Sequence, residues 1–442
     1  MMSLSKKIFQ KKKILIYGLG KTGISSYNYL KNNNKIILYD DNKKVFRNSK
    51  LQNLYLREKK IKQINFDYIV ISPGIDVNNC NLKNYLKINS RKIITDLDIF
   101  YTDHSKNKIV AITGTNGKST TAKLLYLILK KHKIDTRLCG NIGNPILKEK
   151  KIKSKTFFVI ETSSYQIAYS KFFKANYAFI LNISPDHLER HGSIKNYISA
   201  KFKLITKQTK KDFAFINYKD KYLKKKIKSS KILSKIIKIK QNQIINFKKK
   251  IKNPYFLSNS NLENLSFIIS LCSRLNLQTN KIINIINNFK GLKYRQEIIH
   301  KNNNVTIIND SKATSFSSSA NILKSLKRVF WLVGGINKLG DKFKLNKKDC
   351  KHINAYIFGK NKKFFTKQFK NKVSYCCFEN LESAFKQILK DINNKKEYSH
   401  KTILFSPSAA SFDSFKNFEE RGDYFNFLLK KYKIKKIINA IK

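Results

Sequence analysis

The chain has 442 residues, enough for two to four domains of ordinary size. Hydrophobic residues make up 41% of it and there are only 5 Pro and 15 Gly, so buried cores are possible and wholesale disorder is excluded. Lys and Arg number 91 against 28 Asp and Glu, a formal net charge of +63 that by itself would suggest a nucleic acid or an anionic membrane as the partner.

The distribution of the basic residues argues against that partner. Only 9 of them are Arg, and the remaining lysines are spread over the whole chain. A nucleic-acid binder concentrates Arg and aromatic residues on one element instead. The densest basic run, residues 219–252, is interpreted as a solvated surface rather than a basic amphipathic helix. We therefore expect no specific nucleic-acid partner.

Cysteine spacing and hydropathy indicate the compartment. The six cysteines include no CxxC pair and have no His at metal-ligand spacing, so neither a disulfide framework nor a zinc site is expected. No run of 18 apolar residues occurs, and the basic start leads into a short strand rather than a signal-peptide core. We expect a cytoplasmic protein without membrane insertion. The sequence does not define the oligomeric state, and a monomer is the expectation.

The first pattern is a strand, a glycine turn, a helix and a second strand. ILIY precedes Gly18–Gly23, a helical pattern runs to Leu30, and KIILYD ends at Asp40. This is the βαβ fingerprint of dinucleotide-binding domains, although its glycines allow the backbone to approach any nucleotide diphosphate. A further strand, YIVIS, ends in the turn Ser72-Pro73-Gly74, where α/β sheets bind ligands.

The second pattern indicates a phosphate-binding loop. The buried strand KIVAIT (108–113) is followed by a glycine-rich loop, Lys118, Ser119 and the apolar-periodic helix TAKLLYLILKK. Strand, loop, Lys-Ser and helix are the arrangement that cradles phosphates. Ile112 stands where the generic GxxxxGK[ST] motif has its first Gly, so the context carries this prediction.

Two more strands are expected in the same sheet. FFVIE ends at Glu161, and YAFILNIS leads into Asp186 and His187. A carboxylate and an imidazole at the carboxyl ends of parallel strands are placed to meet a phosphate-bound metal. The alternative is that each is an ordinary hydrogen-bonded polar group at the end of a strand.

The third pattern again alternates strands and helices. VTIIN, RVFWLVGGI, AYIFG and KTILF are the expected strands, beginning after about Gly291. Alternating strands and helices in all three parts predict an α/β protein with parallel sheets.

Five segments carry a family resemblance: TGTNGKST (113–120), ETSSYQ (161–166), LNISPDHLERHGS (181–193), NDSKAT (309–314) and SPSAASFDSFKNFEERG (406–422). In this order they resemble the Mur ligases over nearly the whole chain. NDSKAT and FKNFEERG are similar to the branch of the family that adds D-glutamate. Three places depart from the usual pattern: the pair Asp41-Asn42, Ser260, and Ala409 or a neighbour of it in SPSAAS.

The resemblance implies an ATP-dependent amide ligase of peptidoglycan synthesis. The carboxylate of UDP-N-acetylmuramoyl-L-alanine would take the γ-phosphoryl group of ATP, and the amine of D-glutamate would attack the acyl phosphate. It also implies three domains: a Rossmann-like UDP-substrate domain (1–102), a central P-loop-type ATPase domain (103–291) and a Rossmann-like C-terminal domain that binds the amino acid (292–442).

The site residues are carried over by matching motifs. The ATP site would comprise Gly114, Thr115, Asn116, Gly117, Lys118, Ser119, Thr120, Asn261, Asn264, Arg295, Asp310 and Lys312. Mg²⁺ would be held by Ser119, Glu161, His187 and Lys201, with Lys201 carbamylated because an ammonium cannot ligate a cation. Lys118, His187 and Lys201 would be catalytic. The UDP substrate would contact Thr22, Asp40, Gly74 and Asn141, and D-glutamate would contact Thr314, Lys338, Ser411 and Phe418.

Three other interpretations stay open on the sequence. A nicotinamide-dependent oxidoreductase would explain Gly18–Gly23 with Asp40, but it leaves Lys118 and Ser119 without a role. A Mur-type ligase that adds another amino acid is the alternative within the family. A basic RNA scaffold depends on the net charge alone.

Overall fold

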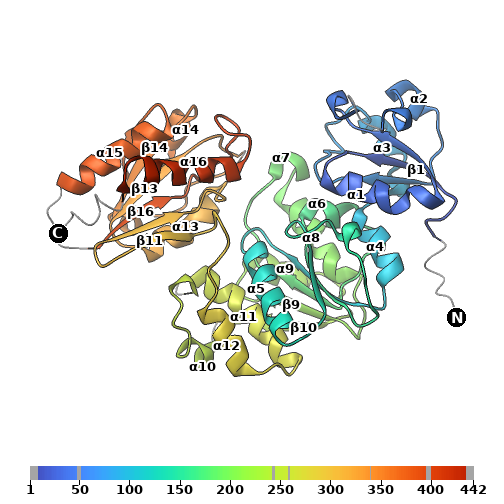
Figure 1. Cartoon of the computed structure of the whole chain (residues 1–442), viewed down its shortest axis with the longest axis horizontal. Helices are drawn as coiled ribbons and strands as arrows, with labels where there is room; N and C mark the ends of the chain where they lie inside the picture. Colours follow the sequence, from blue (N-terminus) through green and yellow to red (C-terminus); the bar gives the residue numbers. More distant parts are fainter. Residues whose placement is uncertain are drawn as a thin grey trace. The chain divides into compact units, whose positions relative to one another are not determined.

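The computed structural model describes residues 8–46, 51–240, 244–256, 259–338, 340–394 and 400–434. Three separate sheets with surrounding helices confirm the expected α/β fold (Figure 1). The chain forms two compact units. The first comprises residues 1–183, 190–250 and 263–285 and contains two sheets, and the second comprises residues 184–189, 251–262 and 286–442 and contains the third. The domain boundaries after residues 102 and 291 stay predictions.

The first sheet has the strand order β2-β1-β3-β4 and is parallel. Its strands are β1 (Lys13–Tyr17), β2 (Lys35–Tyr39), β3 (Tyr68–Ile71) and β4 (Ile93–Ile94), and its helices are α1 (Lys21–Leu30), α2 (Glu58–Lys62), α3 (Lys83–Ile88) and α4 (Asp96–His104). Successive strand residues face opposite sides of the sheet. Leu15 and Ile69 accordingly share a core cluster with α2 and α3, whereas Ile14 and Val70 share one with α1 and α4. The strands predicted from ILIY, KIILYD and YIVIS are confirmed.

The second sheet is also parallel, with the order β10-β9-β8-β5-β7-β6. Its strands are β5 (Lys108–Thr113), β6 (Thr136–Gly140), β7 (Phe157–Glu161), β8 (Tyr177–Ile180), β9 (Phe213–Asn217) and β10 (Lys235–Ile239). The helices in this part of the chain are α5 (Lys118–Lys131), α6 (Ser164–Tyr169), α7 (Leu188–His191), α8 (Ile194–Thr206), α9 (Lys221–Lys228), α10 (Ile245–Lys248), α11 (Asn259–Arg274) and α12 (Thr279–Asn287). The α1/α4 face of the first sheet and the core of the second belong to one hydrophobic cluster, which is why these two sheets form one unit.

The structure adds detail to two expectations for this region. The strand expected over YAFILNIS ends at Ile180, so its last four residues lie outside the sheet. The Leu181 N–H still donates to the Thr113 carbonyl of the neighbouring strand β5. The basic run 219–252 is not one long helix. It contains the eight-residue helix α9, the edge strand β10 and the short helix α10, with residues 241–243 outside the described part.

The third sheet has the order β11-β12-β16-β13-β14-β15, and only its edge pair β11–β12 is antiparallel. The strands are β11 (Glu297–Lys301), β12 (Val305–Asn309), β13 (Val329–Gly334), β14 (Ile353–Phe358), β15 (Ser374–Cys377) and β16 (Lys401–Phe405), and the helices are α13 (Phe316–Ser325), α14 (Lys362–Phe369), α15 (Leu381–Asn394) and α16 (Phe418–Lys431).

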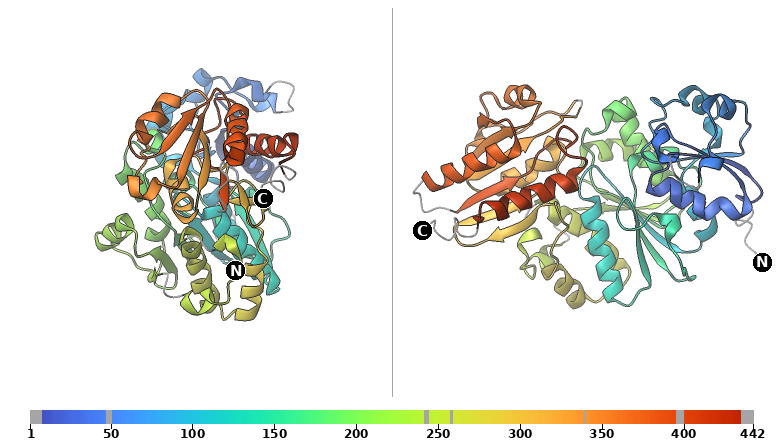
Figure 2. Two further views of the ribbon diagram at one scale, coloured as in Figure 1. Left: turned by 90° about the vertical axis from the view of Figure 1, so that its left-hand side faces the viewer. Right: turned by 45° about the horizontal axis from the view of Figure 1, so that its top comes forward.

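Helices cover both faces of this third sheet (Figure 2). Phe330 and Leu332 of β13 belong to the core with α15 and α16, and the alternate residues Trp331 and Val333 belong to the core with α13 and α14. The period of two along β13 therefore builds a three-layer domain. Among the described residues of the whole chain, no helix is long and apolar enough to cross a membrane.

Candidate active site

The phosphate loop follows β5 and starts helix α5, as the strand-loop-helix pattern predicts. Gly117 has φ +83°, a left-handed conformation that glycine adopts without strain, and it precedes the first residue of the helix. The Lys118 Nζ lies 2.9 Å from the Gly114 carbonyl and 2.8 Å from the Thr115 carbonyl. The loop thus holds its lysine at the N-terminus of α5, where backbone N–H groups favour an anion.

Asn182 supports this loop and was not predicted as a site residue. Its Oδ1 accepts a hydrogen bond from the Asn116 N–H (2.8 Å), and its Nδ2 donates to the Asn116 carbonyl (3.1 Å). Its backbone carbonyl accepts from the Thr115 N–H at 3.0 Å. Asn182 follows β8, the strand next to β5, so only its position at the carboxyl end of a neighbouring strand could have identified it.

The predicted metal ligands Ser119 and Glu161 lie together. Ser119 Oγ donates to Glu161 Oε2 at 2.6 Å, and both side chains are buried. The main chain after β6 is close by, because the Asn141 N–H donates to the Glu161 carbonyl at 3.0 Å. The side chain of Asn264 lies against Gly117. Ser119, Glu161, Asn141, Asn264 and the loop therefore meet at one edge of the second sheet.

Lys201 is on the buried face of α8 and only 2% exposed. Its Nζ donates to the Gly114 carbonyl at 2.9 Å and to Thr113 Oγ1 at 3.4 Å, and it lies 4.6 Å from the ring centre of Tyr197. A lysine this buried is unusual unless it is paired. Lys201 therefore lies beside the glycine-rich loop and is not part of the solvated lysine surface.

A second set of predicted residues lies at the carboxyl end of the first sheet. The Asp40 carboxylate accepts from the Leu19 N–H (2.7 Å) and the Asn42 N–H (2.9 Å), which holds the turn after β1. Ser72 Oγ donates to the Gly18 carbonyl at 2.6 Å, joining this turn to the one that carries Gly74. Gly74 itself is exposed.

Thr22 lies in the first turn of α1, beside the same glycine turn. The predicted UDP-substrate residues other than Asn141 are thus gathered around two adjacent turns. Asp41, where the family pattern departs, accepts a hydrogen bond from the Tyr17 hydroxyl at 2.6 Å.

In the second unit, Lys312 and Phe418 are brought together from segments more than 100 residues apart. The Lys312 Nζ lies 3.6 Å from the ring centre of Phe418, a cation–π geometry. Ser311 Oγ donates to the Phe418 carbonyl at 2.8 Å. Arg421, fully buried, donates from Nη2 to the carbonyls of Ser311 (2.8 Å) and Ala409 (2.9 Å). Arg421 was not predicted, and it joins NDSKAT to SPSAAS.

Asp310 is a buried carboxylic acid in the same unit. Its carboxylate accepts from the Ser406 hydroxyl (2.9 Å) and the Gln296 N–H (3.1 Å). Burial raises the pKa of Asp310 to about 7. Arg295 is the residue before Gln296, and Asn261 donates to the Gln296 side chain at 3.3 Å, so these three predicted ATP-site residues are linked within the second unit.

Lys338 and His187 both lie next to the carboxylate of Asp186. The Lys338 Nζ lies 2.6 Å from Asp186 Oδ1, and the His187 Nε2 lies 3.5 Å from Asp186 Oδ2. His187 has φ +55°, a strained conformation for a residue with a side chain. Thr314 precedes α13, and Ser411 is buried in the turn after SPSAA. His187 belongs to the second unit, whereas Lys201 belongs to the first.

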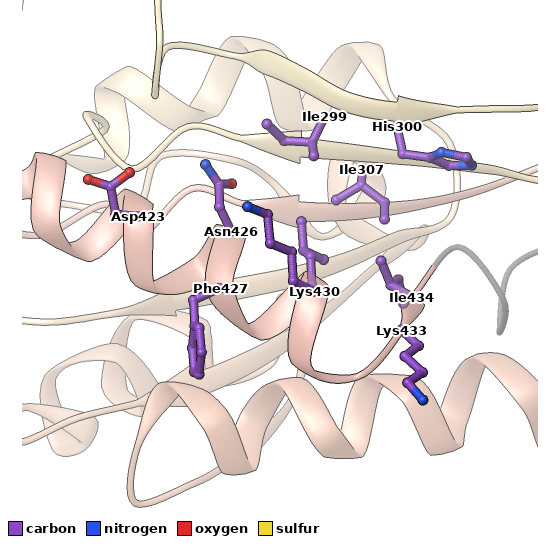
Figure 3. A pocket seen from close by; sticks show the side chains of 10 residues that line it. Ile299, His300, Ile307, Asp423, Asn426, Phe427, Lys430, Lys433 and Ile434 are labelled. Carbon is purple, nitrogen blue, oxygen red and sulfur yellow. The ribbon is translucent and has the colours of Figure 1, made fainter.

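One cavity of about 750 Å³ is lined by none of these predicted residues. It is in the C-terminal domain, between strands β11 and β12 and helix α16 (Figure 3). Its walls include Ile299, His300, Ile307, Phe427 and Lys430. None of its lining residues is a predicted site residue, so it is not the candidate active site.

Comparison with known proteins identifies the family. The profile of the Mur ligase middle domain matches residues 112–278, and that of the MurD-like N-terminal domain matches residues 12–94. A protein of Rickettsia prowazekii is 36% identical over 96% of this chain and 99% of its own length. The chain belongs to the Mur ligase family.

Other relatives agree with this assignment. A Mur ligase from the Wolbachia of Brugia malayi is 32% identical over 96% of the chain and 97% of its own length, and both relatives are named UDP-N-acetylmuramoylalanine--D-glutamate ligase. The solved structure of MurF from Thermotoga maritima in complex with ADP covers 98% of each chain with a TM-score of 0.57 at 15% identity. MurC from the same organism covers 96% of this chain and 100% of its own, with a TM-score of 0.53 at 16% identity. The three-domain Mur ligase fold implied by the motifs is therefore confirmed.

Proposed function

We propose that the chain uses ATP to join D-glutamate to UDP-N-acetylmuramoyl-L-alanine, a step of peptidoglycan synthesis. One observation supports this choice of substrates. The chain is similar, over nearly the full length of both chains, to relatives named for this reaction. The substrate carboxylate accepts the γ-phosphoryl group of ATP. The D-glutamate amine then attacks the acyl phosphate, and the tetrahedral intermediate expels phosphate.

The loop 114–120 binds the ATP phosphates in this proposal. Its backbone N–H groups lie at the N-terminus of α5, and the Lys118 ammonium lies at the same end of the helix. Phosphoryl transfer needs positioning and charge compensation more than covalent help from the protein. Lys118 therefore compensates charge on the transferred group, while Asn261, Asn264, Arg295, Asp310 and Lys312 contact the rest of the nucleotide.

Ser119 and Glu161 fit a magnesium ion. Their oxygens are 2.6 Å apart, and a hydroxyl and a carboxylate are the oxygen ligands that Mg²⁺ prefers. Within the described residues no group of three His, Cys, Asp or Glu side chains is arranged for a metal. Mg²⁺ in proteins commonly takes one or two carboxylates together with substrate phosphates and several waters. When bound, the ion neutralises charge on the phosphates.

Lys201 and His187 contribute to a second magnesium site in this proposal, with Lys201 as a carbamate. Burial of Lys201 next to the loop supports a role at the phosphates. An ammonium repels a cation, whereas a carbamate offers oxygen ligands.

The acidic amine substrate is bound by the C-terminal domain. Lys338 and Lys312 supply positive charge for its carboxylates, and Ser411, Thr314 and Phe418 shape the site. The UDP substrate is bound by the turns that carry Thr22, Asp40 and Gly74, together with Asn141. Since ATP and UDP-sugars are cytoplasmic metabolites, we place the reaction in the cytoplasm.

The test is phosphate release from ATP with UDP-N-acetylmuramoyl-L-alanine and each of four amino acids: D-glutamate, L-glutamate, L-alanine and meso-diaminopimelate. We expect release with D-glutamate alone. Release with a different amino acid would move the chain to another branch of the family, and no release with any of them would refute the proposal.

A further inference from the structure

Arg190 binds the turn that contains Gly74. Its Nη1 donates to the Pro73 carbonyl at 2.6 Å, and its Nη2 donates to the Ile75 carbonyl. Both contacts lie within the first compact unit. Ser72, just before Pro73, is held in turn by its bond to the Gly18 carbonyl. Two carbonyls that flank one glycine are thus bound by one planar guanidinium, whose fork of donors a lysine cannot reproduce.

The guanidinium is itself fixed by an aromatic stack. Its central carbon lies 3.7 Å from the ring centre of Tyr165, and the side chain is only 12% exposed. Tyr165 stacks on His191 with ring centres 5.1 Å apart and an interplanar angle of 11°. His191 Nε2 is hydrogen-bonded to Ser164 Oγ at 2.9 Å. The arginine therefore has a defined position before any ligand binds.

The same stack continues to the phosphate loop. The ring of His191 packs edge-on against Tyr197, with centres 5.3 Å apart. The Tyr197 hydroxyl lies 3.1 Å from Thr115 Oγ1 in the loop. Contacts between side chains thus connect the Gly74 turn with the phosphate loop.

The orientation of the turn follows from peptide geometry. In a trans peptide the C=O of one residue and the N–H of the next point in opposite directions. The described peptides are all trans, so binding of the Pro73 carbonyl by Arg190 directs the N–H of the exposed Gly74 away from the arginine. A fixed backbone N–H is a donor that suits an anionic ligand.

We propose that Arg190 is a positioning residue for the nucleotide-sugar substrate. It does not touch the substrate. It fixes the Gly74 turn in the conformation that binds the UDP moiety, and the aromatic stack aligns this turn with the phosphate loop. This inference depends on the proposed function, because it takes UDP-N-acetylmuramoyl-L-alanine as the ligand of the turn.

The test compares Arg190→Ala and Arg190→Lys with the wild type. Misplacement of a binding group by about 1 Å can cost on the order of 100-fold. We expect Arg190→Ala to weaken binding of UDP-N-acetylmuramoyl-L-alanine by about 10- to 100-fold in direct titration and to raise its KM similarly, with the KM for ATP changed by less than about twofold. Arg190→Lys should bind with intermediate affinity, since one ammonium reaches only one of the two carbonyls.

Arg274→Ala is the matched control. Arg274 is also in the first unit and also lies over an aromatic ring, 4.2 Å from the centre of Phe213, but it does not contact the turn. It should change neither KM. If Arg190→Ala proves too unstable to assay, Arg190→Lys decides the matter by the same ratio of the two KM values.

The outcomes separate this inference from the proposed function. Unchanged substrate binding by a folded Arg190 variant, or an equal rise in both KM values, would overturn the positioning role while the ligase assignment stands. Failure of the wild type to bind or ligate UDP-N-acetylmuramoyl-L-alanine would refute both.

Discussion

The substitution Gly117→Ala would test the geometry of the phosphate loop directly. Gly117 has φ +83°, and an added Cβ would lie 2.5 Å from Nδ2 and 2.7 Å from Cγ of Asn264, and closer still to its Oδ1. Ordinary contacts of a Cβ are about 3.4–4 Å. Alanine would therefore meet two separate penalties, one from its backbone conformation and one from the Asn264 side chain.

Each penalty has an expected size. A left-handed conformation costs a residue with a Cβ roughly 1–2 kcal/mol. Insertion of a methyl group against the buried Asn264 costs about 1–3 kcal/mol. The free energy of unfolding of the first unit should then fall by about 2–5 kcal/mol, which corresponds to a decrease in Tm of roughly 4–20 °C at about 2–4 °C per kcal/mol.

Thermal unfolding of a double-mutant cycle would separate the two penalties. Asn264→Ala in the Gly117→Ala background removes the collision and should restore about 1–3 kcal/mol relative to additive behaviour, while the backbone cost remains. Gly192→Ala is the matched control, because Gly192 has φ +72° and the nearest atom to an added Cβ is 3.9 Å away. It should show the backbone cost of about 1–2 kcal/mol alone.

Two results would refute the reasoning. Additive effects of Gly117→Ala and Asn264→Ala would mean that the two residues are not in contact. A Gly117→Ala protein as stable as the wild type would mean that the loop does not adopt the left-handed conformation at all.

The remaining predictions concern three side chains. Lys118→Ala should fold normally and lower kcat for ATP-dependent phosphate release by about 100-fold or more, whereas Lys130→Ala at the other end of α5 should not; near-normal turnover of the first variant would contradict a role at the phosphates. Lys201→Ala should lose nearly all turnover and regain part of it with added formate or acetate, and mass spectrometry under CO₂-trapping conditions should detect a carbamate on the wild type; full activity of this variant would exclude Lys201 from the mechanism. The pKa of Asp310 is about 7 in the folded state and 3.8 ordinarily. Between these two values the carboxyl of the unfolded chain loses its proton before that of the folded chain, so the stability of the fold falls as the pH rises. The Tm of Asp310→Asn minus that of the wild type should therefore be more positive at about pH 8 than at about pH 5, whereas Asp349→Asn, which removes a carboxyl whose pKa a neighbouring lysine lowers, should show the opposite or no trend.

Local sequence patterns determined the strands and the phosphate loop, and the family resemblance named the pair Ser119 and Glu161. Gly117, Lys118 and Ser119 are adjacent in sequence, so the geometry of one strand-loop-helix unit places them. Glu161 does lie beside Ser119, because β5 and β7 are parallel neighbours and their carboxyl ends meet at one edge. The departure from the generic loop motif at Ile112 did not matter, since Ile112 is a fully buried strand residue.

Contacts between distant segments were decided only by tertiary structure. Arg190 lies 115 residues or more from the carbonyls it binds, and Arg421 lies 110 residues from Ser311. Both arginines lie inside segments that carry the family resemblance, but those motifs do not show which carbonyls the arginines bind. The resemblance singled out Lys201, and the packing of α8 shows that it is buried. Hydrophobic periodicity identifies which face of an element is buried, but the partner of a buried polar group depends on how the elements pack, and that information is absent from a local pattern.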